Sequence, residues 1–212
     1  MVKNISEEAA EILIDLKCIN FSPKKQFKLT SGKKSPVYCD CRRIISFPEE
    51  REKLIDFGIS KLKEKPKFKK ISNVAGGESA GIPFAAFIAQ KLNLPMTYIR
   101  KEKKKFGKNS QIEGLLNQKD NVLLAEDLMT DGGSKLKFLD AVEKLGANIS
   151  GIFVIFNYGI IKDYYLFKKK KIDVISLTNW SHVLNVASRK KILKNDEVKI
   201  VESFLEKMKV KS

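Results

Sequence analysis

The sequence is poor in the residues that build disulfide frameworks, zinc sites and histidine-based catalysis. Its 212 residues include three cysteines and one histidine. The cysteines, Cys18, Cys39 and Cys41, are odd in number and include no CxxC pair, which argues against a disulfide framework or a zinc site. We therefore expect the cysteines to be small, partly buried side chains and His182 to be a surface or packing residue.

Long hydrophobic runs are also absent. No apolar run approaches the ~20 residues that a membrane-spanning helix needs, and residues 1–5 lack the long apolar segment of a signal peptide. Hydrophobic residues nevertheless make up 43% of the chain, so it can form a packed core. We expect a soluble, cytoplasmic protein without a membrane partner.

Acidic residues are too few to balance the basic ones. The chain has 41 lysines and arginines against 25 aspartates and glutamates, a formal net charge of +16. Such a surplus fits nucleic-acid binding, an anionic small substrate or a lysine-rich solvated surface. Because the lysines are spread along the whole chain, we favour the solvated surface and predict no nucleic-acid partner. The runs 63–70 and 168–171 are interpreted as exposed connectors.

The chain divides into two parts of different pattern. Up to residue 70 we expect a helix from Ser6, short strands at 27–29 and 37–40, and a helix capped by Ser46 that runs from about Pro48 to Leu62. From residue 71 on, strand and helix patterns alternate. The strands are expected at 71–75, 96–100, 121–125, 151–156 and 171–176, and the helices at 82–92 and 134–145.

Alternating strands and helices imply right-handed crossovers and a mainly parallel sheet. Ligands of such sheets bind beyond the carboxyl ends of the strands. Three loops are therefore expected together at one edge of the sheet: 76–81, 101–114 and 126–134.

The stretch VLLAEDLMTDGGSK (122–135) runs from an apolar strand into two carboxylates, Glu126 and Asp127, and then into a loop at 130–134. The loop's backbone N–H groups, the positive end of the following helix and the hydroxyls of Thr130 and Ser134 suit a phosphate, although the Walker pattern GxxxxGK(S/T) is absent. The carboxylates would repel that phosphate unless they serve another part of the ligand, such as ribose hydroxyls and a cationic sugar centre. The alternative is a pair of surface acids in a helix-capping turn.

This pattern resembles the phosphoribosyl diphosphate (PRPP) signature of the type I phosphoribosyltransferases. The resemblance implies an α/β fold, with a mainly parallel central sheet flanked by helices, in one domain that spans residues 1–212. About residues 1–45 would contribute a small N-terminal hood. Glu126 and Asp127 would hold the ribose hydroxyls and the loop would hold the 5-phosphate. The implied PRPP-binding residues of the signature are Glu126, Asp127, Leu128, Met129, Thr130, Asp131 (through its backbone), Gly132, Gly133 and Ser134.

Two further stretches resemble segments of the orotate phosphoribosyltransferases. FKLTSGKKSPVYCDCR (27–42) is similar to the hood segment over the base site, which implies that Tyr38, together with Thr130, binds orotate. VAGGESAGIPFAAFIA (74–89) is similar to the loop that approaches the diphosphate. Ala80 stands where many members have a lysine, so we expect backbone groups rather than a side-chain charge there. The implied diphosphate contacts are Gly76, Gly77 and Glu78.

A third stretch, YIRKEKKKFGKNSQIEG (98–114), resembles the family's mobile lid loop, which we place at residues 101–114. In relatives this loop reaches across a dimer into the neighbouring active site, so the resemblance implies a homodimer with shared lids. Phe106 stands where the family pattern has a histidine, so the side chain at this position cannot donate or accept a proton in the reaction. The implied PRPP-binding residues here are Arg100, Lys101, Lys104 and Phe106, and the implied catalytic residues are Lys104, Lys101 and Asp127.

The resemblance implies transfer of the phosphoribosyl group of PRPP to orotate, which gives orotidine 5′-monophosphate and diphosphate in pyrimidine (UMP) biosynthesis. It implies Mg²⁺ as the cofactor, held by oxygens of the diphosphate and ribose and by no dedicated cage of protein ligands. Two alternatives stay open: a phosphoribosyltransferase for a purine base, and a non-catalytic regulator that keeps the fold and binds nucleic acid. The hood segment and the lid lysines favour orotate and catalysis.

Overall fold

The structure, a computed structural model, describes residues 4–29, 32–103, 111–130, 132–159 and 167–210. Within these residues the central feature is a six-stranded sheet in the order β10-β9-β8-β5-β6-β7. Its strands are β5 (Asn73–Gly77), β6 (Met96–Ile99), β7 (Ile112–Glu113), β8 (Asn121–Met129), β9 (Asn148–Asn157) and β10 (Val174–Asn179).

The sheet is mainly parallel, as predicted. Neighbouring strands from β10 to β6 pair in parallel, and β7 adds an antiparallel edge beside β6. Two of the helical crossovers that such pairing requires are α3 (Gly81–Leu92) after β5 and α4 (Gly133–Leu145) after β8. The predicted α/β fold with a mainly parallel central sheet is confirmed.

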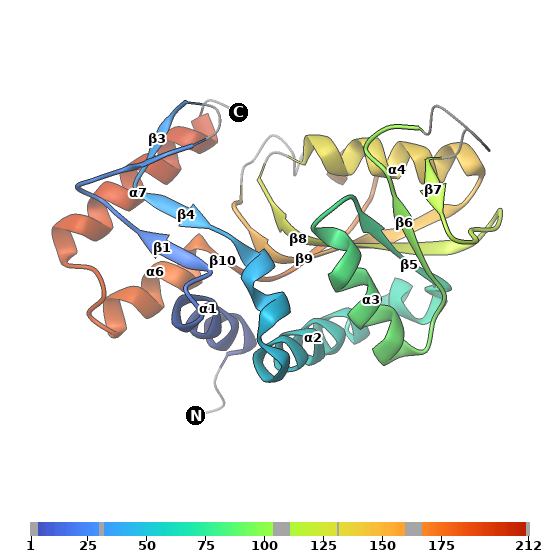
Figure 1. Cartoon of the computed structure of the whole chain (residues 1–212), viewed down its shortest axis with the longest axis horizontal. Helices are drawn as coiled ribbons and strands as arrows, with labels where there is room; N and C mark the ends of the chain where they lie inside the picture. Colours follow the sequence, from blue (N-terminus) through green and yellow to red (C-terminus); the bar gives the residue numbers. More distant parts are fainter. Residues whose placement is uncertain (1–3, 30–31, 104–110, 131, 160–166, 211–212) are drawn as a thin grey trace.

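Helices cover both faces of the sheet (Figure 1). One face packs against α1 (Ile5–Asp15), α2 (Pro48–Lys63) and α3, and the other against α4. Side chains of β8 alternate between the two apolar clusters: Leu123 and Ala125 join the cluster on the α1–α3 face, whereas Val122 and Leu124 join the cluster that contains Phe138 of α4. This alternation continues as far as Glu126 and Asp127 and decides toward which face of the sheet each carboxylate points.

The N-terminal segment forms small antiparallel pairs beside the main sheet. β1 (Ile19–Phe21) pairs with β4 (Val37–Cys39), and β2 (Phe27–Lys28) pairs with β3 (Lys34–Ser35). The 3₁₀ helix η1 (Cys41–Ser46) then passes close to β8. The chain ends with α6 (Trp180–Arg189) and α7 (Asn195–Val210), and α7 lies beside this N-terminal segment in Figure 1.

Two predicted helix caps are wrong. The side chain of Asn4, not Ser6, accepts the capping hydrogen bond at the start of α1, from the backbone N–H of Ser6 at 3.0 Å. Ser46 ends η1 instead of capping α2, whose first turn has Pro48 in place of a side-chain cap. Asparagine competes with serine as a cap, and proline needs no acceptor for its missing N–H, so both errors follow from local chemistry.

Several predicted element boundaries are also wrong, and the last strand, predicted at 171–176, is β10 at Val174–Asn179. Gly76 and Gly77 do not form a turn, because they belong to β5 and the turn follows at Glu78–Ala80. β8 does not end at Ala125 but continues to Met129, through both carboxylates. Pairing with β9 extends to the register pair of Met129 and Asn157, and these parallel contacts keep a charged pair in extended backbone.

The remaining sequence expectations concern cysteines, histidine and membrane helices. All three cysteines are free and buried, with the Sγ atoms of Cys39 and Cys41 3.6 Å apart, and His182 is a half-buried residue of α6. In the ranges that the structure describes, no helix has the length and apolar character that a bilayer crossing requires.

Candidate active site

The carboxyl ends of β8, β5 and β6 lie next to one another, because these strands are parallel neighbours in the sheet. The residues that follow them in the chain therefore meet at one edge. They are the start of the loop at 130–134, the turn at 78–80 and the start of the predicted lid at 100–103. Lys104, Phe106 and Asp131 lie outside the described residues.

Glu126 and Asp127 are buried in β8, with 4% and 7% of their surface exposed. The alternative of two surface acids in a helix-capping turn is therefore wrong. Alternation along the strand turns Glu126 toward α4 and Asp127 toward the other face, where η1 lies. The two carboxylates therefore lie on opposite faces of the sheet at this edge and do not form one common surface.

Glu126 is enclosed between α4 and the end of β5. Its Oε2 atom lies 3.3 Å from Nζ of Lys135 in an ion pair, while Oε1 is buried and has no hydrogen-bond partner among the described residues. The carboxylate packs so closely on β5 that a side chain at Gly77 would overlap Oε1 and the ring of Phe138. Burial raises the pKa of Glu126 to about 7, and the charge of Lys135 opposes this rise.

Asp127 has different neighbours. Burial raises its pKa, whereas the backbone N–H of Leu128 and the charges of Lys135 and Arg42 lower it. Arg42, the second residue of η1, forms a two-pronged contact with Asp40, with Nε 2.6 Å from Oδ1 and an Nη atom 2.9 Å from Oδ2. The N-terminal segment therefore brings a fixed cation close to the second carboxylate.

The loop after β8 leads directly into α4. Gly132 is the N-cap of this helix with φ of 70°, a conformation that favours glycine, and it has no side chain to accept the first N–H groups. The positive end of α4 therefore lies at the edge of the sheet, beside Thr130 and Ser134. Met129 packs in the core, and its carbonyl accepts a hydrogen bond from the N–H of Tyr158 at 2.9 Å.

The turn after β5 is tied to the chain after β6. The N–H of Glu78 donates to the carbonyl of Ile99 at 2.8 Å, and its Oε2 accepts from the N–H of Lys101 at 2.8 Å. The charge of Glu78 thus contacts backbone at the start of the predicted lid. This contact joins two of the predicted anion-binding segments.

The predicted lid begins after β6 and ends at β7, and these two strands pair antiparallel. Its base is closed by two hydrogen bonds between Arg100 and Gln111, at 2.8 and 2.9 Å, and by an ion pair of 3.8 Å between Arg100 and Glu113. Ile112 and Glu113 belong to β7, so the predicted lid of 101–114 included two strand residues. Lys101 is exposed at the start of the loop.

Tyr38 and Tyr158 lie near each other on the side of the N-terminal segment. Tyr38 is 39% exposed, and its ring centroid lies 5.9 Å from that of Phe27. Tyr158 follows β9, packs edge-on against Trp180 and has its pKa raised by burial. A cavity of about 350 Å³ opens beside Tyr158, Asn179 and Trp180.

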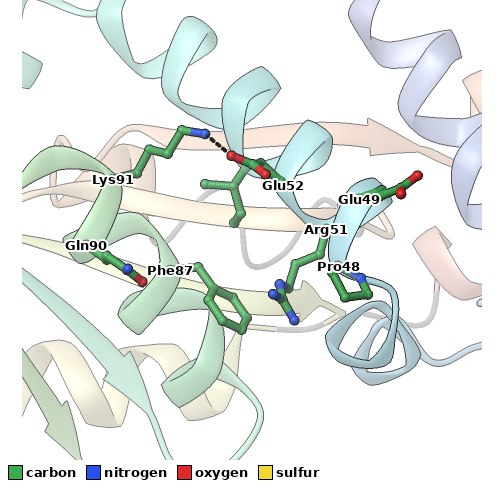
Figure 2. A pocket seen from close by; sticks show the side chains of 8 residues that line it. Pro48, Glu49, Arg51, Glu52, Phe87, Gln90 and Lys91 are labelled. Carbon is green, nitrogen blue, oxygen red and sulfur yellow. Dashed lines mark hydrogen bonds and ion pairs between the residues drawn. The ribbon is translucent and has the colours of Figure 1, made fainter.

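A separate groove of about 480 Å³ between α2 and α3 contains none of the predicted site residues. Its Lys91 is paired with acidic residues of α2, as Figure 2 shows for Lys91 and Glu52, whose atoms lie 2.8 Å apart. Arg51 stacks over the ring of Phe87 at 4.2 Å. The groove is lined by residues of α2 and of the second half of α3. The candidate site lies at the other end of α3, next to its first residues.

The sequence did not predict three residues that the structure places at the candidate site: Lys135, Arg42 and Tyr158. Lys135 directly follows the phosphate-type loop, so its position in VLLAEDLMTDGGSK was the available signal. Arg42 ends the FKLTSGKKSPVYCDCR stretch, but its proximity to Asp127 joins residues far apart in the chain. No local pattern marks Tyr158.

A model of the phosphoribosyl transferase domain matches residues 48–187. Orotate phosphoribosyltransferase from Rhizobium rhizogenes is 42% identical over 202 residues, which cover 95% of this chain and 87% of that protein.

Solved structures give the same comparison at lower identity. The UMP synthase of Leishmania donovani superposes with a TM-score of 0.79 at 24% identity, covering 95% of this chain but only 42% of that longer chain. Orotate phosphoribosyltransferase of Mycobacterium tuberculosis in complex with PRPP superposes with a TM-score of 0.65 at 20% identity, covering 84% and 98% of the two chains. At these identities the superpositions establish the shared fold.

Proposed function

The chain belongs to the orotate phosphoribosyltransferase family and is a pentosyltransferase, and on that premise we propose that it joins orotate to PRPP at the edge formed by β8, β5 and β6. The products are orotidine 5′-monophosphate and diphosphate. The observation that carries this assignment is the pair of buried carboxylates at the end of β8, directly before the positive end of α4.

The sugar and its 5-phosphate would bind at β8 and α4. Asp127 and Glu126 accept hydrogen bonds from the ribose hydroxyls, and the loop from Thr130 to Ser134 binds the 5-phosphate with N–H and hydroxyl donors. Leu128 and Met129 contribute through the backbone. Buried carboxylates also favour the positive charge that develops on the sugar when its bond to the diphosphate oxygen breaks. Orotate N1 then attacks the opposite face of the anomeric carbon, and its proton passes to the released diphosphate or to water.

The diphosphate would bind between the end of β5 and the lid. Backbone groups of Gly76, Gly77 and Glu78 approach it, and Arg100, Lys101 and Lys104 supply positive charge, with Phe106 packing nearby. The hydrogen bond from Lys101 N–H to Glu78 supports this arrangement, because it fixes the start of the lid next to the turn. Closure of the lid excludes water, which would otherwise hydrolyse the cationic sugar.

Mg²⁺ would offset the charge of the leaving diphosphate. Among the described residues, no group of three or more His, Cys, Asp or Glu side chains is placed to hold a metal ion. Mg²⁺ prefers oxygen ligands and keeps several waters. We therefore assign its ligands to oxygens of PRPP and to water, while Glu126 and Asp127 act on the sugar.

The base and the assembly complete the proposal. Orotate would lie between the hood, with Tyr38, and the loop after β8, with Thr130, and Tyr158 borders the same region. The enzyme would act in the cytoplasm as a homodimer whose lids reach into the neighbouring site.

The test is the loss of orotate absorbance after PRPP and Mg²⁺ are added to the purified protein. We expect turnover that requires all three components and that excess adenine or hypoxanthine does not inhibit. Turnover of a purine base with PRPP, or no PRPP-dependent loss of orotate, would contradict the proposal.

A further inference from the structure

Lys135 is the only buried lysine among the residues that the structure describes, with 8% of its surface exposed. It is the third residue of α4, and Lys137, two residues later on the same helix, is exposed. Lysines are almost never buried without a partner, because removing an ammonium group from water is costly. The position of Lys135 in the helix therefore calls for an explanation that Lys137 does not need.

Its partner is the carboxylate of Glu126, 3.3 Å from Nζ, with 10% and 5% of the two side chains exposed. The rest of the carboxylate's surroundings are backbone and apolar groups: a Cβ at Gly81 would lie 3.0 Å from Oε1, and Phe138 packs one turn after Lys135. Lys135 is therefore the cation in direct contact with a carboxylate that water barely reaches.

Three charged groups act on Glu126. Lys135 of α4 and Lys101 at the start of the lid lower its pKa, and Asp127 on the same strand raises it, while burial outweighs them and sets the value at about 7. Lys135 lowers the pKa more than Lys101 does, and Lys101 is exposed to solvent. Without Lys135, burial and Asp127 would raise the pKa of Glu126 further, so a larger fraction of this carboxyl group would be protonated at neutral pH.

We propose that Lys135 is a positioning residue of the reaction: its ion pair keeps the buried Glu126 carboxylate charged and oriented, so that it can accept hydrogen bonds from the ribose and oppose positive charge on the sugar. This inference rests on the proposed function. A neutral carboxyl group accepts hydrogen bonds less strongly, must place its own proton, and has no negative charge to oppose positive charge on the sugar. Lys135 acts through Glu126 and does not touch the reacting atoms.

The variant Lys135→Met tests this role, because methionine keeps an apolar side chain of similar length without the charge. We expect the acid limb of the pH profile of kcat/KM for PRPP to move up by about one pH unit or more, which lowers kcat/KM about tenfold per unit below the limb. At alkaline pH the kcat/KM of the variant for PRPP approaches that of the wild type, and its KM for orotate is unchanged at every pH. Lys135→Arg restores the charge and keeps the limb in place, and the matched control Lys137→Met leaves the whole profile unchanged.

A second measurement needs no substrate. Urea unfolding should show Lys135→Met to be at least as stable as the wild type under acid conditions, because protonation of Glu126 leaves the buried Lys135 of the wild type without its charged partner. It should show a larger loss of stability on going to alkaline pH, where the variant must bury an unpaired carboxylate. The free energy of unfolding of Lys137→Met should change with pH in the same way as that of the wild type.

Two results would overturn the role of Lys135. One is an acid limb of Lys135→Met that coincides with that of the wild type, and the other is an equal loss of kcat/KM at every pH, which marks a residue needed only for folding. If the wild type itself fails to consume orotate, the proposed function is wrong. The unfolding series then decides alone whether Lys135 keeps Glu126 charged.

Discussion

The two neighbouring carboxylates at the end of β8, Glu126 and Asp127, differ in their surroundings. Glu126 lies between α4 and the end of β5 with an ammonium group as its partner, whereas Asp127 lies toward η1, where Arg42 is the nearby cation. Both have a raised pKa because of burial. The charged form of Glu126 is favoured mainly by Lys135, whereas that of Asp127 is favoured first by the backbone N–H of Leu128 and then by nearby cations. Substitutions at the two positions should therefore have distinct effects.

Asp127→Asn should weaken PRPP binding about tenfold or more, because a hydrogen bond to a charged acceptor contributes roughly 1.5–3 kcal/mol. Isothermal titration calorimetry with PRPP measures this directly. Asp140→Asn, on the exposed side of α4, is the control and should bind like the wild type. Unchanged affinity of Asp127→Asn would remove Asp127 from the ribose site.

Glu126 should make stability depend on pH. Its pKa is about 7 in the folded protein against an ordinary value of 4.5, so the folded state holds the proton more tightly. The stability gained from this proton is complete below the unfolded pKa and is lost as pH rises through the folded pKa, by an amount on the order of 3 kcal/mol.

Urea unfolding of the wild type and of Glu126→Gln tests this at about pH 5 and about pH 8. The free energy of unfolding of the wild type, relative to that of the variant, should be greater at the lower pH. A difference between the two proteins that does not change with pH would contradict the raised pKa of Glu126.

Among the elements, the end of β5 is the most tightly constrained. Gly77 lies where the carboxylate of Glu126 and the ring of Phe138 leave no room for a side chain. Gly77→Ala should therefore lower the free energy of unfolding by about 1–3 kcal/mol, the usual cost of overpacking, and should displace Glu126. Chemical denaturation measures the first effect. A variant as stable as the wild type would show that β5 and α4 can separate without loss.

The predicted lid connects β6 to β7. Lys104→Ala should lower kcat by roughly 10²-fold or more, because lost stabilisation of transition-state charge costs ~3–4 kcal/mol. Steady-state assays measure this, with Lys137→Ala as a control on the surface of α4. A change of less than about threefold would refute the role of Lys104.

The elements differ in how well the sequence predicts them. Apolar runs revealed the central strands, because buried parallel strands need hydrophobic residues on both faces. The last third of β8 was missed because two carboxylates suggest a strand end, and only pairing with β9 keeps them in the sheet. β3 and β7 have two residues each, too few for any periodic pattern to form.

The site was predictable where it is local in sequence. The carboxylates, the loop after them and the helix start lie within one short stretch, so a single pattern connects them. The contact between Lys135 and Glu126 lies in that same stretch but depends on the close approach of α4 to β8. The proximity of Arg42 to Asp127 depends on the whole N-terminal segment folding over the sheet, which no local pattern encodes.

On the scale of the whole molecule, the net charge of +16 comes from lysines and arginines that are spread along the chain. The lysine runs 63–70 and 168–171 precede β5 and β10, so they lie toward the amino ends of these strands, opposite the candidate site. Nζ of Lys67 donates to the carbonyl of Lys171 at 3.0 Å, and this contact brings the two exposed runs side by side. These exposed lysines fit the solvated surface that the sequence predicts.

The central claim is that the carboxylates of β8 hold the ribose while the loop before α4 holds its phosphate. A crystal structure after soaking with ribose 5-phosphate tests it most directly. We predict electron density with the phosphate against residues 130–134 and the ribose hydroxyls within hydrogen-bonding distance of Asp127 or Glu126. Density for the compound in the groove between α2 and α3, or in the cavity beside Trp180, would contradict the claim.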